Sequence, residues 1–197
     1  MADETEARIL DLHRAGDTKG ALAEAVDAYG AEVYGFLVSR LRDEDAAGDA
    51  LAQTWEDLCA SIGAFEWRCS MRTWMYKLAR SAAARERRGR GGQGDVPLSA
   101  VSEVAEQLRS RTRDYLRTEV KDGFSALREE LPPDDQTLLI LRVDRGLSWS
   151  EVAEVLSDGD PDDDERARAA ARLRQRFKAI KEQLRTRAIE AGLIDAS

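Results

Sequence analysis

The sequence predicts an all-α protein made of two small helical domains joined by a flexible linker. Apolar side chains recur at helical spacing along most of the 197-residue chain. Val, Ile and Thr form none of the alternating runs that are typical of β-strands. A Gly-rich stretch at residues 89–97 interrupts the helical pattern near the middle of the chain. We therefore expect a domain over residues 1–90, a linker over 91–119 and a second domain over 120–197.

Four helices are expected in the N-terminal domain. They span residues 5–16, 18–41 (as one helix or a broken pair), 44–62 and 71–88. Gly16 and Gly63 stand where the first and third of these should end. The third carries one apolar face made of Ala47, Leu51, Trp55 and Leu58. In the fourth we expect Trp74, Leu78 and Ala82 to point inward.

The C-terminal domain is predicted to be a helix-turn-helix with an extended acidic turn. A first helix begins at the Pro132-Pro133-Asp134 passage and ends before Gly146. Ser148 and Glu151 have the spacing of a capping box, so a short helix should cover residues 149–156. Acidic residues 158–165 follow, and a long helix should begin near Asp162–Asp164. Its apolar stripe, which should face the core, is Leu173, Phe177, Ile180 and Leu184.

Charge is distributed unevenly along this chain of net charge −8. Residues 1–60 hold 14 acidic and 5 basic side chains, which favours a protein partner. Residues 80–90 hold five arginines and one acid, and residues 166–187 hold nine basic side chains and one acid. Two separate basic faces in an acidic protein suggest two contacts with one polyanion.

Several functional classes lack the residues that they need. No apolar run approaches the length of a membrane span, and the acidic first residues do not resemble a signal peptide, so we expect a cytoplasmic protein without membrane insertion. Cys59, Cys69 and His13 are too few for a Cys/His zinc site. We expect two buried or half-buried thiols, with a redox-sensing pair as the alternative. We find no nucleophile–base set and no phosphate loop, and expect neither an enzyme nor a cofactor.

Three passages occur in an order that is typical of one protein family. The first is Ala-Gly-Asp-Ala-Leu-Ala-Gln-Thr-Trp, residues 47–55. The second runs from Phe65 to Arg80 and includes Arg-Thr-Trp at residues 72–74. The third joins Leu131-Pro132, Gly146-Leu147-Ser148 and Glu151-Val152-Ala153 to the basic helix. Together they resemble regions 2 and 4 of the extracytoplasmic-function (group IV) sigma factors, the minimal group of the sigma-70 family of bacterial RNA polymerase.

The resemblance implies that the N-terminal domain has two binding surfaces. In the family, the face that matches Asp49, Leu51 and Gln53 grips the polymerase core, in which the β′ and β subunits are the partners. The second passage implies contact with the promoter −10 element, where a loop captures a flipped base. The candidates for that contact are Glu66, Trp67, Arg68, Arg72, Lys77, Arg80, Ser81 and Arg85. For Trp74 we prefer core packing to a stacking role, and Trp67 on the loop is the more open to stacking.

The resemblance also implies that the basic helix enters the major groove of the −35 element. The candidates there are Arg172, Arg174, Gln175, Arg176, Lys178 and Lys181. Promoter DNA and core RNA polymerase would then be the partners, and an anti-sigma protein is an expectation that comes from the family alone. A stand-alone helix-turn-helix regulator, binding promoter DNA without polymerase, is the alternative function.

The acidic segment 157–171 is longer than an ordinary helix-turn-helix turn. The alternation of Asp158, Asp160 and Asp162 is reminiscent of a calcium loop, but Asp163 and Ala169 stand where such a loop needs Gly and Glu. One interpretation is that the acids stabilise the start of the following helix through its dipole. Our hypothesis is that they also screen the DNA-reading face in the free protein.

Overall fold

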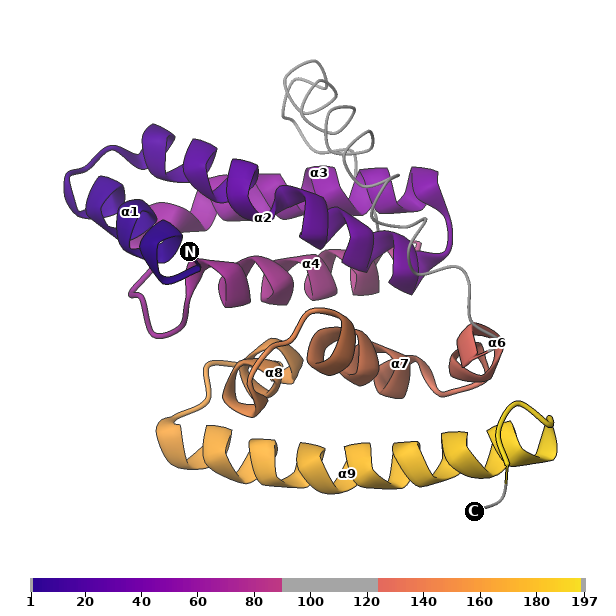
Figure 1. Ribbon diagram of the computed structural model, residues 1–197. Helices are drawn as coiled ribbons and strands as arrows, with labels where there is room; N and C mark the ends of the chain where they lie inside the picture. Colours follow the sequence, from indigo (N-terminus) through magenta and orange to yellow (C-terminus); the bar gives the residue numbers. More distant parts are fainter. Residues whose placement is uncertain (1, 90–123, 196–197) are drawn as a thin grey trace. The chain divides into compact units, whose positions relative to one another are not determined.

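The computed structural model describes residues 2–89 and 124–195, and all their regular elements are helical (Figure 1). The all-α prediction is therefore confirmed. The helices form two compact units, one containing α1–α4 and the other α6–α9. The expected linker, residues 91–119, lies outside the described residues. Within the described ranges, no helix combines the length and the apolar character that crossing a membrane would take.

The first unit is a bundle of α1 (Ala2–Arg14), α2 (Thr18–Leu41), α3 (Glu44–Ser61) and α4 (Met71–Arg87). A 3-10 turn, η1 (Ile62–Ala64), follows α3. Side chains that accept backbone N–H groups start three of the helices: Asp17 for α2, Asp43 for α3 and Ser70 for α4. The helix over 18–41 is thus one unbroken element.

The core of this unit lies among α2, α3 and α4. Phe36, Leu37, Leu51, Leu58 and Tyr76 are among its fully buried side chains. All four residues of the face predicted for the third helix are buried. The face predicted for α4 is only partly right, because Met71, Met75 and Ala79 fill the core beside Ala82. Trp74 and Leu78 are half-buried at the edge of that face.

The second unit contains α6 (Phe124–Glu129), α7 (Pro133–Leu139), a π-helical turn η2 (Ile140–Asp144), α8 (Trp149–Leu156) and α9 (Asp163–Glu190). Both predicted starts are confirmed: Ser148 and Glu151 form the capping box of α8, and Asp162 caps α9. Gly146 has a φ of +67°, a conformation that glycine adopts without strain. Ser157–Asp162 is the connection between α8 and α9, since the last acids belong to the first turn of α9.

One continuous α9 passes beside α6, α7 and α8 (Figure 1). Ile180 is buried, and Leu173, Phe177 and Leu184 are half-buried, so the predicted stripe does face the core. Leu138, Leu141, Leu147 and Val152 complete that core. Cys69 is half-buried, as expected, whereas Cys59 differs from expectation because it is exposed on α3.

Candidate nucleic-acid and polymerase interfaces

A row of half-buried aromatic rings covers the loop between η1 and α4. The Phe65 and Trp67 rings lie 5.1 Å apart, and Phe65 stacks on Trp74 at 5.4 Å. The Lys77 ammonium lies 5.6 Å from the Trp74 ring centre, at cation–π distance. Trp74 therefore contributes to a surface row of rings rather than to the buried core. Aromatic rings next to cations are the groups on which unpaired bases stack.

Trp67 has an unusual backbone conformation and a specific side-chain partner. Its φ is +58°, in the left-handed region that costs a residue with a side chain roughly 1–2 kcal/mol. Its indole N–H donates to Nδ1 of His13 in α1 over 3.1 Å. His13 Nε2 in turn lies 2.8 Å from the carbonyl oxygen of Ile62, to which it donates. Because one ring nitrogen accepts and the other donates, these contacts select the neutral Nε2–H form of His13.

Two arginines that were predicted to contact DNA instead form ion pairs within the fold. Arg72 makes a two-pronged bond to Glu32 of α2, with Nε–Oε1 and Nη2–Oε2 distances of 2.6 and 2.9 Å. Arg85 pairs with Asp57 of α3. The geometry of the Arg72 pair is the bidentate one that holds guanidinium and carboxylate groups most firmly. Sequence reasoning missed both partners, since neither lies near its arginine along the chain.

Three of the other −10 candidates are more accessible than these two arginines. Glu66, Arg68 and Ser81 are exposed, whereas Lys77 and Arg80 are half-buried on α4. Ser81 donates its hydroxyl to the backbone oxygen of Lys77. These residues share the loop and one helix, so the structure brings them into a single region of the first unit.

The residues predicted to contact the polymerase core do not all share one surface. Asp49 is exposed on α3, and Gln53 is half-buried, donating to Glu56 and Asp57 over 3.1 Å each. Leu51 is fully buried in the bundle core. The assignment of Leu51 to the surface is therefore wrong, because a side chain two positions from Asp49 on a helix points to a different face.

All six −35 candidates are exposed along the middle of α9. Behind them, Phe177 meets Trp149 of α8 edge to face at 5.3 Å, which fixes α9 against α8. The Arg174 and Arg142 guanidiniums lie over the Trp149 ring at 6.0 and 4.9 Å. Arg176 hydrogen-bonds to Asp135 of α7, which raises the pKa of this arginine further. A row of cations on a helix of this kind suits phosphates and base edges.

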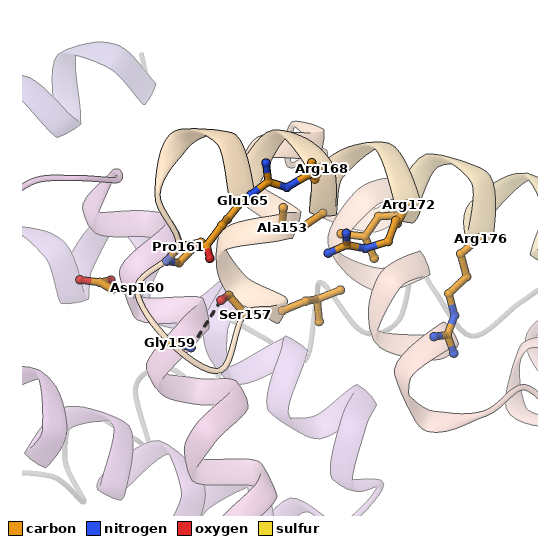
Figure 2. A pocket seen from close by; sticks show the side chains of 12 residues that line it. Ala153, Ser157, Gly159, Asp160, Pro161, Glu165, Arg168, Arg172 and Arg176 are labelled. Atoms are coloured by element: carbon orange, nitrogen blue, oxygen red, sulfur yellow. Dashed lines mark hydrogen bonds between the residues drawn. The ribbon is translucent and has the colours of Figure 1, made fainter.

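A groove of about 680 Å³ opens beside the N-terminal half of α9 (Figure 2). Arg168, Arg172 and Arg176 follow one another along its helical wall, and the Ser157–Pro161 connection forms the opposite side. Arg166 ties the first turn of α9 to α8. It donates to Glu154 of α8 at 3.0 Å and to Asp163 in its own turn at 2.7 Å. The acidic segment thus makes local caps and pairs, which sequence reasoning identified only for the helix start.

Comparisons with known proteins point in one direction. No protein-family model matches the chain. It is 24% identical over 164 residues to the RNA polymerase sigma-H factor of Pseudomonas aeruginosa, covering 79% of this chain and 84% of that protein. It is 27% identical over 131 residues to the RNA polymerase sigma factor YlaC of Bacillus subtilis, covering 65% of this chain and 75% of that protein. Neither similarity favours a stand-alone regulator.

Proposed function

We infer that this chain is an RNA polymerase sigma factor, which binds core RNA polymerase and directs promoter recognition and transcription initiation. The observation that carries this inference is its similarity to a sigma factor along 79% of its length. Catalysis would then belong to the polymerase, and this chain would supply recognition without being an enzyme. We propose further that it belongs to the extracytoplasmic-function group of the sigma-70 family and acts in the cytoplasm.

In this proposal each unit holds one promoter element. The exposed Arg174, Gln175 and Lys178 of α9 would contact base edges and phosphates of the −35 element. The loop with Glu66, Trp67 and Arg68 would hold an unpaired base of the −10 element. Arg72 and Arg85 would act indirectly, by keeping α4 in place through their ion pairs.

The surface around Asp49 and Gln53 on α3 would dock on the polymerase core, including its β′ subunit. The double variant Asp49→Ala/Gln53→Ala should weaken binding to core polymerase without destabilising the fold, because Asp49 is exposed and Gln53 only half-buried. Glu44→Ala, at another exposed position of α3, is the matched control and should bind normally. Pull-down titration against core enzyme measures both. Equal binding by the double variant and the wild type would remove this surface from the proposal.

Leu51→Ala has a different expected outcome. It removes a fully buried side chain and should lower the free energy of unfolding by about 2–5 kcal/mol. Any loss of polymerase binding should follow that instability and disappear at a temperature where the variant is folded. Urea unfolding beside the pull-down separates the two effects.

In vitro transcription with added core polymerase over a genomic template library tests the function as a whole. A sigma factor yields specific transcripts only when both proteins are present. The alternative, a stand-alone regulator, would instead bind promoter DNA tightly without polymerase and initiate nothing. Absence of initiation on every template, together with tight binding by the free chain, would overturn the proposal in favour of that alternative.

A further inference from the structure

We infer that α1 is a brace that positions the base-contacting loop, with His13 holding Trp67 and Glu6 holding the start of α4. The inference rests on the proposed function, because it assigns the brace a role in binding unpaired promoter bases. It concerns residues 6 and 13, which lie outside the three passages that resemble the sigma-factor regions.

The first attachment is at the end of the loop. Glu6 Oε2 accepts the backbone N–H of Met71 at 2.8 Å, and Glu6 Oε1 accepts that of Arg72 at 3.0 Å. Ser70 accepts the next N–H group, that of Thr73. Helix starts leave such N–H groups without intrahelical partners, so one carboxylate from α1 completes the cap of α4. The position at which the loop enters α4 is thereby tied to α1.

The second attachment is in the middle of the loop. His13 joins the Trp67 indole to the Ile62 carbonyl, and the imidazole ring also meets the Trp67 ring edge to face at 5.7 Å. The left-handed φ of Trp67 persists only where its surroundings hold it. His13 and Phe65 both contact the indole and so restrict how the side chain can turn. Without His13, we expect the backbone of Trp67 to leave the left-handed conformation and its ring to turn away from its present position.

The two ends of the brace act on one ring surface. Glu6 and His13 lie about two turns apart on α1, and the loop between Ile62 and Met71 is attached at both. The Trp67, Phe65 and Trp74 rings lie within this loop and the first turn of α4. A base that stacks on this surface therefore meets rings whose positions α1 has already set, which lowers the ordering cost of binding.

The chemistry of His13 allows a selective test, because Nδ1 accepts a hydrogen bond from Trp67 whereas Nε2 donates one to Ile62. Asn places an amide oxygen near the position of Nδ1, where it can accept from Trp67, whereas Gln places an amide nitrogen near Nε2, where it can donate to Ile62. His13→Asn should therefore keep the Trp67 contact and His13→Gln should lose it. Trp67→Phe removes the indole N–H and leaves a stacking ring, so it tests the same hydrogen bond from the other side.

The experiment measures the affinity of the holoenzyme for a single-stranded oligonucleotide that carries the non-template −10 sequence of a promoter found in the library transcription assay. We expect His13→Gln, Trp67→Phe and Trp67→Ala each to weaken binding about tenfold, the scale of one stacked base. His13→Asn should stay within about twofold of the wild type. The double variant His13→Gln/Trp67→Ala should bind no more weakly than Trp67→Ala alone. If His13 acts only by positioning the Trp67 ring, its loss has no further effect once that ring is gone.

Controls separate positioning from folding and from the proposed function. Affinity for core polymerase and for −35 duplex should not change in any variant, and thermal unfolding should remain cooperative. If His13→Gln fails to fold, the oligonucleotide affinities of Trp67→Phe and His13→Asn can still be compared, because the first loses the hydrogen bond and the second keeps it. Wild-type affinity in His13→Gln or in Trp67→Phe, or losses that multiply in the double variant, would overturn the inference while leaving the function intact. If the wild-type holoenzyme does not bind the oligonucleotide at all, the proposed function is contradicted, and the role of the brace with it.

Discussion

At the scale of single residues, partners that are distant along the chain decide what each polar side chain can do. Arg72 lies in the middle of a passage rich in DNA-binding candidates, yet Glu32 of another helix holds its guanidinium. Asp135 similarly engages Arg176, which remains half exposed. The partners of Arg72 and Arg176 depend on how helices pack, and local spacing does not contain that information. The burial of Leu51, by contrast, follows from its place on the apolar face of α3, two positions from the exposed Asp49.

Arg72→Ala should therefore act on stability before it acts on DNA binding. It leaves the half-buried Glu32 carboxylate without the bidentate partner, so we expect a loss of about 1–3 kcal/mol in the free energy of unfolding. The salt dependence of DNA binding should stay unchanged. Arg87→Ala, at an exposed position of the same helix, is the matched control and should leave stability within about 0.5 kcal/mol. If DNA binding by Arg72→Ala depends less steeply on salt concentration than binding by the wild type, Arg72 does contact DNA.

At the scale of secondary-structure elements, the sequence predicts best what local chemistry determines. The capping box at Ser148 and the start of α9 near Asp162 depend on residues within three positions of one another. The inward face of α4 was harder to predict, since Trp74 is large and apolar but stands at the margin of the core. The sequence gives no indication of the contacts by which Glu6 and His13 of α1 hold the loop. A lone histidine and an N-terminal glutamate carry no local signal for contacts about 50 to 65 residues away.

The length of α9 separates the acids of its first turn from Arg174, in the middle of the DNA-reading face. Asp163 and Arg174 are 11 positions apart on one helix, a separation of roughly 16 Å. This exceeds the Debye length of about 8 Å at physiological ionic strength. The acids instead complement the helix start, through the Asp162–Glu165 capping box and the Asp163–Arg166 pair.

Asp163→Asn/Asp164→Asn should thus leave affinity for −35 duplex within about twofold of wild type. We expect a stability loss of about 0.3–1 kcal/mol for each neutralised acid, from the helix dipole. Arg174→Ala serves as the positive control and should lower both affinity and the salt slope, the latter by about one. Titrations at several salt concentrations measure this. Affinity that rises about tenfold in the neutralised variant would restore the screening hypothesis, since a tenfold change corresponds to 1.4 kcal/mol.

At the scale of the whole molecule, two units with separate cores are joined by a stretch of chain outside the described residues. Two weak contacts that share one chain gain affinity from the high effective concentration of the second contact once the first has formed. This fits a protein that has two strongly basic blocks, residues 80–90 and 166–187, although its net charge is −8. The Gly-rich break at residues 89–97, which the sequence displays directly, is the feature that predicts two domains.

A Gly/Ser insertion that doubles the length of chain between residues 89 and 124 should weaken binding to a two-element promoter only about threefold. The reason is that doubling the length of a flexible linker, which the Gly-rich sequence predicts here, costs about 0.6 kcal/mol. Binding to isolated −10 or −35 DNA should be unchanged. Gel-shift titration of the holoenzyme checks both. A loss beyond about thirtyfold would mean that this stretch does more than connect the units.

The contact between His13 and Trp67 has a practical consequence, because the chain contains a single histidine. An isotope-labelled sample would give one set of imidazole nitrogen resonances, assigned without further work. Their chemical shifts distinguish the two neutral tautomers, so they would report whether the ring still bridges Trp67 and Ile62. The same signal, followed as promoter DNA is added, would show in solution whether the bridge survives when a nucleotide arrives.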